Sequence, residues 1–435
     1  MRQRIRILLL MDEVWNDALC GNNNSTNWFS EFADAEFAAI CCSEGVPYNS
    51  CCRKYFQVTD RMMFKSLFSK RAAGTILDDR DYGKEADKNS AKAEENKIIE
   101  KISSTHFDLF RLARDILWLS GRYDIKALTD FIEDFSPDIV FSMRRATVKI
   151  LRLERLIHKI SALPVVAFTG DNELEEGVPM ISPFAITRKL MIRHALKKTA
   201  PLYSKYYTSS EEQAETYAKN YGIETGLLFK CAKADREAVH KTSNNPIRLL
   251  YVGRLYCGRW KTLAAIGDVL KKANGKEVKA VLDIYSRDEL TKEQEARLND
   301  ERSIVFKGAI LPEKIKDEYK NSDVVLHVES FDMKNRAVTR HSYSTKVVDC
   351  LASGCAVMAI GWEKHSACIE LRKSDSAIVV TDINKLEEAV KDLLENREKI
   401  LEYAEKAMTN IEKEHSKDVI QNQLYNDFLE IVLKK

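Results

Sequence analysis

Apolar runs of strand length alternate with helical segments along the second half of the chain. The runs occupy residues 247–253, 278–286, 303–310, 323–330, 355–361 and 376–382. The intervening segments 261–273, 312–322 and 344–354 have the spacing of apolar residues that is typical of helices. Near-continuous apolar strands that alternate with helices predict a parallel sheet covered on both faces. We therefore expect a Rossmann-like domain over residues 244–415.

The first half of the chain repeats this alternation less regularly. Its candidate strands occupy residues 4–12, 36–42, 137–143, 164–170 and 202–210. They predict a second α/β domain over residues 1–243, and the polar segment 234–246 is the expected linker, with a boundary near Asn244. The predicted fold class is thus α/β with two Rossmann-like parallel-sheet domains. The polar stretch 78–97 has few apolar residues and is expected to be a surface loop.

Composition narrows the function classes. The 435 residues allow two or three domains, and 45% apolar with 31% charged residues excludes collagen-like and mostly disordered chains. Lys plus Arg (68) nearly equals Asp plus Glu (66), so no global positive field is available for nucleic acid. No stretch of 18 uncharged apolar residues predicts a membrane span. Ten cysteines without a CxxC pair favour reduced thiols in the cytoplasm over a zinc site.

The first candidate site follows the strand at 247–253. Gly253 ends this strand, and Arg254, Arg259 and Lys261 come directly after it in the segment GRLYCGRWKT. The carboxyl edge of a parallel sheet is where open α/β proteins bind ligands. Arg259 and Trp260 stand where a phosphate loop requires Lys and Ser or Thr, which excludes that motif. A solvated basic turn is the alternative to an anion site.

The second candidate site is the segment HSYSTKVVDCLASGCAVMAIG at 341–361. Ser344 or Thr345 begins a helix, and its first amides together with Lys346 suit an anionic group. Asp349 lies four residues after Thr345, on the same helix face, where its carboxylate can accept hydrogen bonds from vicinal hydroxyls. The alternative is an ordinary helix cap. Both segments reach one sheet edge, so they predict a clamp around a single diphosphate.

These residues resemble the nucleotide-sugar-dependent glycosyltransferases of the GT-B fold, in particular their retaining branch. The matching segments are YVGRL with Lys261, IVFKGAI, SDVVLHVES and STKVVDCLASGCAVMAIG, with SPDIVFSM and LPVVAFTGDN in the first half. The resemblance implies two domains facing across a cleft and a last helix, within 416–435, that crosses back to the first domain. It also implies transfer of a sugar, with retention, from a nucleoside diphosphate to a saccharide or lipid-linked hydroxyl, in polysaccharide or glycoconjugate biosynthesis.

The resemblance assigns roles to particular residues. Arg254 and Lys261 would hold the donor diphosphate, and Asp349 would bind the ribose. The backbone of Gly308, Ala309 and Ile310 would meet the base. One departure concerns His341, which stands where many members carry a glutamate that touches the transferred sugar, and it leaves the identity of that sugar open. Three cations already neutralise the phosphates, so we expect no metal and no cofactor.

Candidate acceptor residues lie in the first domain. The loop 21–32 carries Asn22, Asn23, Asn24 and Ser25, and it suits a polyhydroxylated acceptor or serves as a plain connector. Asp171 and Asn172 follow the strand at 164–170, where Asp171 either orients the acceptor hydroxyl or caps a turn.

Segment 185–205 contains six Lys and Arg residues and no acidic residue. It is either a solvated helix face or a peripheral contact with the inner face of an anionic membrane. Two alternative functions remain open for the whole chain. One is a sugar-nucleotide epimerase on the same fold, and the other is a catalytically degenerate sugar-nucleotide-binding protein, which His341 motivates.

Overall fold

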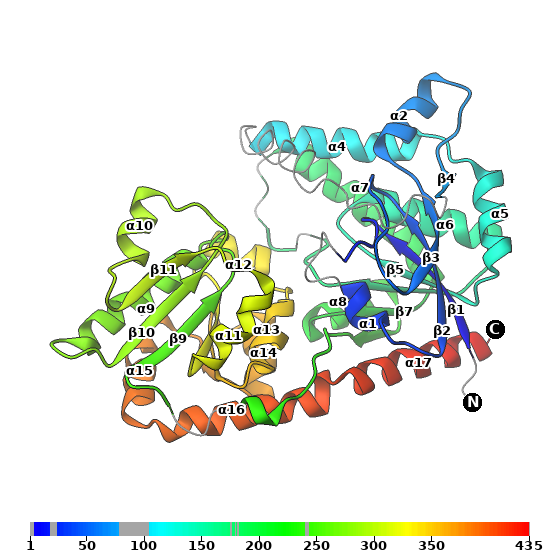
Figure 1. Cartoon of the computed structure of the whole chain (residues 1–435). Helices are drawn as coiled ribbons and strands as arrows, with labels where there is room; N and C mark the ends of the chain where they lie inside the picture. Colours follow the sequence, from blue (N-terminus) through cyan, green and yellow to red (C-terminus); the bar gives the residue numbers. More distant parts are fainter. Residues whose placement is uncertain are drawn as a thin grey trace. The chain divides into compact units, whose positions relative to one another are not determined.

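The computed structural model describes residues 4–17, 24–77, 104–174, 176–178, 180, 182–239 and 243–434 (Figure 1). The chain divides into two compact units. Unit 1 comprises Met1–Leu228 and Gln421–Lys435, and unit 2 comprises Phe229–Ile420. The sequence-based division near Asn244 falls later in the chain than this one. The segment 78–97 lies outside the described residues.

Unit 1 contains an eight-stranded sheet in the order β4-β3-β2-β1-β5-β6-β7-β8. Its pairs are parallel except for β3 and β4, which are antiparallel. The strands are β1 (Ile5–Met11), β2 (Ala35–Cys41), β3 (Cys52–Gln57), β4 (Thr75–Ile76), β5 (Ile139–Met143), β6 (Val165–Thr169), β7 (Tyr203–Thr208) and β8 (Thr225–Leu227). The helices are α1 (Asn24–Phe29), α2 (Asp60–Phe68), α4 (Ser104–Ser120), α5 (Ile125–Phe135), α6 (Val148–Ser161), α7 (Pro183–Thr199), α8 (Glu211–Tyr221) and α17 (Lys417–Leu433).

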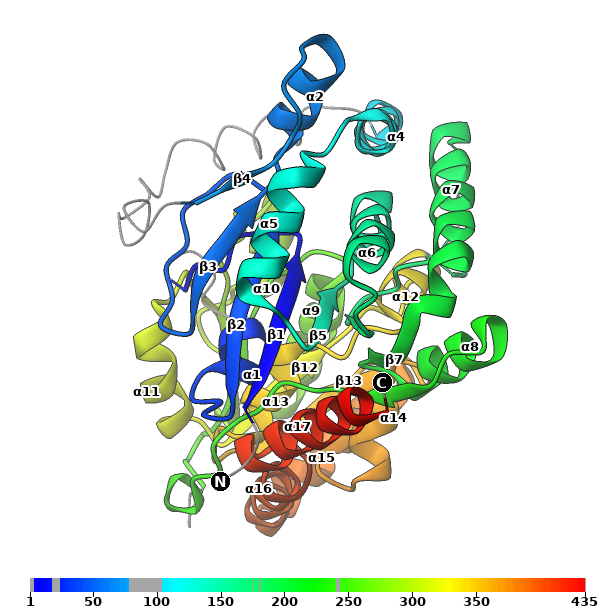
Figure 2. The same cartoon turned by 90° about the vertical axis from the view of Figure 1, so that its right-hand side faces the viewer.

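Both faces of this sheet are buried, which explains its continuous apolar strands. Along β5, Val140 joins one core cluster with side chains of α4, α5, α6 and α7. Its neighbour Phe141 points to the opposite face, where it packs against Trp28 of α1 and Phe428 of α17. Figure 2 shows these helices on the two sides of the sheet. Gln421 of α17 also donates to the backbone carbonyl of Trp28, so the last helix belongs to unit 1.

Unit 2 contains a six-stranded parallel sheet in the order β11-β10-β9-β12-β13-β14. The strands are β9 (Ile247–Val252), β10 (Ala280–Tyr285), β11 (Ile304–Gly308), β12 (Val324–Val328), β13 (Ala356–Ile360) and β14 (Ile378–Val380). The helices are α9 (Arg259–Asn274), α10 (Lys292–Leu298), α11 (Ile315–Lys320), α12 (Met333–Thr339), α13 (Thr345–Leu351), α14 (Ser366–Lys373), α15 (Leu386–Glu395) and α16 (Glu398–Asn410). All eleven predicted strand positions carry strands, whereas β3, β4 and β8 were not predicted.

The order of the second sheet positions the site. β9 lies between β10 and β12, so the chain reverses its direction of growth across the sheet beside β9. Ligands of open α/β sheets bind at the carboxyl ends of the strands at such a reversal. Residues that follow β9, β10 and β12 are therefore brought to one place. No helix among the described residues is long and apolar enough to cross a membrane.

Candidate active site

A group of cations gathers at the carboxyl end of β9 in unit 2. Gly253 follows the strand directly, and a Cβ atom added to it would lie 2.9 Å from Nζ of Lys346. Lys346 lies in the first turn of α13, whose N-cap is Ser344. Arg254 follows Gly253, and Arg259 is the first residue of α9. The backbone at Gly253 and the ammonium group of Lys346 approach each other closely because residue 253 has no side chain.

Arg259 is fixed by a buried carboxylate. Its Nη2 and Nε atoms donate to Oε1 of Glu329 at 2.6 Å and 3.1 Å. Glu329 follows β12 and is 1% exposed. Burial by itself lowers the pKa of Arg259, but the charge and hydrogen bonds of Glu329 outweigh burial and raise that pKa. Arg259 is therefore a permanent, preoriented cation at the sheet edge.

Lys346 experiences the other cations directly. Burial is the main cause that lowers the pKa of Lys346, and the positive charges of Arg259 and Arg254 lower it further. An anion placed between these groups would relieve the repulsion and favour the charged lysine. Arg254, Arg259 and Lys346 therefore contribute positive charge at the same end of the sheet.

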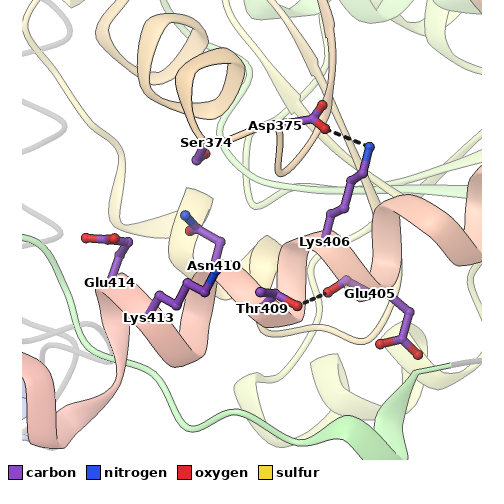
Figure 3. A pocket seen from close by; sticks show the side chains of 8 residues that line it. All are labelled: Ser374, Asp375, Glu405, Lys406, Thr409, Asn410, Lys413 and Glu414. Atoms are coloured by element: carbon purple, nitrogen blue, oxygen red, sulfur yellow. Dashed lines mark hydrogen bonds and ion pairs between the residues drawn. The ribbon is translucent and has the colours of Figure 1, made fainter.

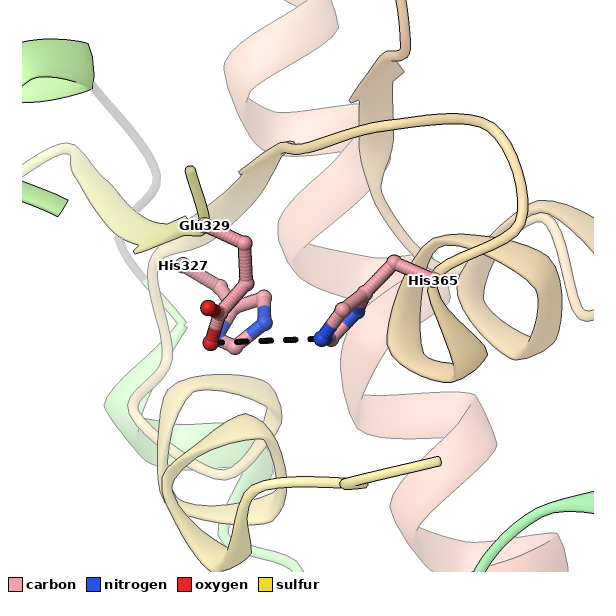
Figure 4. Close-up of side chains that lie close together, drawn as sticks. All are labelled: His327, Glu329 and His365. Carbon is pink, nitrogen blue, oxygen red and sulfur yellow. Dashed lines mark ion pairs between the residues drawn. The ribbon is translucent and has the colours of Figure 1, made fainter. Parts of the chain in front are cut away.

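Two buried histidines stand beside Glu329. Figure 4 shows His327 and Glu329 at the end of β12 and His365 ahead of α14. Burial lowers the pKa of His327 and of His365, and Arg259 lowers both further. Candidate ligand atoms of the three residues lie within 4.8 Å of one another. Two histidines and one carboxylate are a ligand set that transition metals use. The cluster fits this role poorly, because Arg259 donates twice to Oε1 of Glu329 and would repel a divalent cation. We interpret Glu329 as the residue that orients Arg259, with His365 Nε2 4.0 Å from the same carboxylate oxygen.

Arg254 and Lys261 make contacts nearer to solvent. Arg254 pairs with Asp288, which follows β10, and its side chain is 58% exposed. The guanidinium groups of Arg254 and Arg259 lie 5.6 Å and 5.0 Å from the ring of Tyr256. The side chain of Lys261 is 55% exposed, and its Nζ lies 2.9 Å from Oδ2 of Asp332. Of the cations predicted in this loop, Arg254 and Arg259 act on the pKa of Lys346, and Lys261 pairs with Asp332.

The other predicted donor residues have varied surroundings. Oδ1 of Asp349 lies 2.5 Å from Nζ of Lys230, so a ribose at this carboxylate would share it with a lysine. The hydroxyl of Ser344 accepts from the amide of Lys346 at 3.4 Å, and α13 continues from Thr345 for only seven residues. His341 is 3% exposed.

Gly308 ends β11, and Ala309 and Ile310 follow it, at the far edge of the sheet from β14. Gly308 has a φ of 75°, which favours glycine. Its carbonyl accepts from the amide of Ser286 after β10. The backbone of this turn is thus tied to the neighbouring strand, two strands away from the cations after β9.

The predicted acceptor residues lie in unit 1. Asn22 and Asn23 are outside the described residues. Asn24 begins α1, whereas Ser25 is fully buried and contacts Sδ of Met143. Asp171 is exposed after β6, and its carbonyl accepts from Gln213. Asn172 exchanges two hydrogen bonds with the backbone of Glu176, so its amide holds its own loop.

A pocket of about 380 Å³ lies elsewhere in unit 2 (Figure 3). Its lining comprises Ser374, Asp375, Glu405, Lys406, Thr409, Asn410, Lys413 and Glu414. These residues come from the end of α14, from α16 and from the π-helical turn that follows α16. Lys406 pairs within this region with Asp375 and Glu402. We assign no ligand to the pocket because its lining carries both signs of charge, and Lys406 and Glu405 already have ion-pair partners.

Sequence analysis missed the acidic partners of the cations. Glu329, Asp288 and Asp332 each follow a strand of the second sheet, and Glu329 stands directly after the apolar run DVVLHV. A carboxylate that ends a buried strand was the available signal, because such a group needs a cation once it is desolvated.

Comparisons with solved structures identify the fold. Sucrose-phosphate synthase from Thermosynechococcus elongatus matches with a TM-score of 0.62 at 11% identity, over 100% of both chains. An α,α-trehalose-phosphate synthase (UDP-forming) from Burkholderia xenovorans, in complex with glucose-6-phosphate, matches with a TM-score of 0.59 at 9% identity, over 98% of this chain and 100% of that chain. HepE from Anabaena, in complex with UDP, matches with a TM-score of 0.59 at 14% identity, over 98% and 100%. The two parallel-sheet domains are those of the GT-B fold.

Residues 252–425 match the family described as glycosyl transferase-like. These residues include the cationic loop after β9, Glu329 and helix α13. No curated protein matches the sequence at a significant level. The family match covers most of unit 2, and the GT-B fold covers the whole chain.

Proposed function

We propose that this protein is a glycosyltransferase that takes its sugar from a nucleoside diphosphate and transfers it, with retention, to a hydroxyl of a saccharide or lipid-linked acceptor in polysaccharide or glycoconjugate biosynthesis. The observation that carries the donor class is the close approach of Lys346 to the backbone of Gly253, at a strand end where the charges of Arg254 and Arg259 also act on Lys346. Such a cluster is suited to a compact, multiply charged anion. The UDP in the HepE structure and the UDP-forming neighbour support the same class.

The cations act on the leaving group. During transfer the bond between the anomeric carbon and the phosphate oxygen breaks, and negative charge builds up on the diphosphate. Arg259, held by Glu329, meets this charge without having to reorient, and this is the condition under which a fixed charge lowers a barrier most. Lys346, in the first turn of α13, adds a second positive charge. The anomeric carbon then bonds to the acceptor oxygen, whose proton leaves with the diphosphate or to water.

This arrangement makes a metal ion unnecessary for the diphosphate, because three side chains supply the positive charge. Asp349 remains a candidate for the ribose, provided that the ribose hydroxyls share the carboxylate with Lys230. Asp171, exposed at the carboxyl end of β6, remains the candidate that orients the acceptor hydroxyl in unit 1.

A panel of nucleoside diphosphates and their sugars tests the proposed donor class. We expect the full chain to show a raised melting temperature with one nucleoside diphosphate, since a ligand of the native state stabilises it. A labelled sugar of that nucleotide should release free nucleoside diphosphate when acceptor is added, and EDTA should leave this release unchanged. An altered sugar still attached to its nucleotide would instead identify an epimerase, and binding without turnover would identify a degenerate enzyme.

The affinity for a nucleoside diphosphate should begin to fall at a lower pH than it would if Lys346 had the pKa of an ordinary lysine. The pKa of Lys346 is lowered, so the ammonium group loses its proton at a lower pH than the usual value of about 10.4. Affinity should therefore fall as pH rises through the lowered pKa. Titration calorimetry between pH 7 and pH 10 measures this fall in affinity.

Lys346→Arg is the matched variant, because arginine stays charged throughout this range. It should bind at pH 7 with an affinity similar to that of the wild type and keep that affinity up to pH 10. The same fall in affinity in wild type and Lys346→Arg would show that another group titrates.

A further inference from the structure

Helices α2, α4 and α7 of unit 1 form one layer, in which α4 contacts both of the others (Figures 1 and 2). We call the solvent-exposed side of these three helices the helical face. It carries large apolar side chains in the open. Such side chains are normal when scattered singly, but their concentration on neighbouring helices marks a surface that another body covers.

Helix α2 contributes the most exposed aromatic groups. Phe64, Leu67 and Phe68 are 57%, 41% and 77% exposed. They stand at positions i, i+3 and i+4, and therefore on one side of the helix. The rings of Phe64 and Phe68 lie 5.2 Å apart. The buried residues of α2 are Met63, which lies in the core, and Ser66, so Phe64 and Phe68 are not needed to pack α2 against the core.

Helices α4 and α7 extend the same pattern. On α4, Phe110 is 62% and Ile116 is 48% exposed, whereas Trp118 is fully buried. On α7, Ile186 and Leu190 are 44% and 61% exposed. Each helix thus has an apolar side towards the sheet and further apolar groups towards solvent. Packing among the described residues of unit 1 accounts only for the first.

The charge around these apolar groups is positive. Lys65, Lys70 and Arg71 are exposed at α2 and just after it, and Arg193, Lys197 and Lys198 are exposed along α7. The acidic residues of the layer are largely neutralised within it. Asp60 pairs with Arg114 at 2.8 Å, and Asp115 pairs with Arg188 at 2.7 Å.

We propose that the helical face docks the protein on an anionic lipid bilayer, with Phe64, Phe68 and Phe110 in the interfacial layer and the lysines on the headgroups. Apolar side chains flanked by Lys and Arg are what an interfacial surface requires. Charge complementarity selects this occupant over a second copy of the chain, because two basic faces would repel each other. The proposal goes beyond sugar transfer and does not depend on the donor proposed above.

Sedimentation of the full chain with vesicles tests the proposal. We expect binding to vesicles of equal parts phosphatidylglycerol and phosphatidylcholine, and at least about tenfold weaker binding to pure phosphatidylcholine. The double variant Phe64→Ser, Phe68→Ser should reduce binding to the anionic vesicles by about tenfold or more. Reversing Arg193 and Lys197 to Glu should have a similar effect that diminishes in high salt.

Matched controls separate the helical face from general stickiness. Leu433→Ser removes a side chain that is 68% exposed on α17, and Lys316→Glu with Lys320→Glu reverses two exposed lysines four residues apart on α11. Both controls should bind as wild type, and all variants should keep the wild-type melting temperature. The proposal would be overturned if the protein bound neutral and anionic vesicles equally, or if the control variants lost as much binding as the test variants. It would also be overturned if the protein did not bind vesicles and instead formed a concentration-dependent dimer that Phe64→Ser, Phe68→Ser abolishes.

Discussion

Replacing Arg259 with alanine is expected to lower kcat/KM for sugar transfer by about 10²- to 10³-fold, or about 3–4 kcal/mol of transition-state stabilisation. Arg259 is charged at every accessible pH and is oriented by Glu329 through 2.6 Å and 3.1 Å contacts. Its loss removes a preorganised charge from the developing diphosphate. Steady-state kinetics with the donor identified in the nucleotide panel measures the effect.

Removing Arg259 also leaves Glu329 buried without its cation, which by itself destabilises the protein. The double variant Arg259→Met, Glu329→Gln keeps the site neutral and separates the two effects. We expect it to melt close to wild type while remaining as inactive as Arg259→Ala. Recovered activity in the double variant would show that Arg259 has only a structural role.

Lys261→Ala is the matched control within the same helix. Its ammonium group pairs with Asp332 on an exposed side chain, so we expect less than about threefold loss, because exposed pairs contribute little. The resemblance found in the sequence predicted that Lys261 binds the donor diphosphate. A loss for Lys261→Ala as large as that for Arg259→Ala would support that assignment over the one proposed from the structure.

Replacing Arg144 with methionine is expected to lower the free energy of unfolding by about 3–5 kcal/mol. Arg144 follows β5, and its guanidinium pairs with Glu154 at 3.1 Å and also with Glu173, where all three side chains are 0% exposed. Tyr203 donates to Glu154 at 2.7 Å, which completes the network around that carboxylate. Methionine fills similar space but leaves two carboxylates in the core without a cation. Urea unfolding followed by tryptophan fluorescence measures the loss.

The adjacent residue provides the control for this experiment. Arg145 pairs with Glu13 at 3.3 Å, but its side chain is 58% exposed. Arg145→Met should therefore cost less than about 1 kcal/mol. Equal losses for Arg144→Met and Arg145→Met would mean that burial of the Arg144 network contributes nothing measurable.

The amino-acid sequence determined the architecture because the hydrophobic pattern is a local property. In β9, β12 and β13 the apolar residues are nearly continuous, as a strand buried on both faces requires. β3 was missed because Arg53 and Lys54 interrupt its apolar pattern. β4 and β8 are too short to show a period. The sheet edge that carries the candidate site followed from the parallel order of these strands.

The tertiary structure decided which charged side chains meet. Arg259 and Lys261 are two residues apart and looked equivalent in the sequence, yet α9 turns one towards buried Glu329 and the other towards exposed Asp332. Lys346 joins Gly253 from a segment nearly a hundred residues away, and the apolar groups of α2, α4 and α7 share one layer only after folding. Hydrophobic periodicity is set by neighbours along the chain, whereas ion pairing and exposure depend on residues that are distant in sequence. For that reason the sequence by itself determined the fold class and the edge of the candidate site, and only the folded chain decided its cations and its exposed helical face.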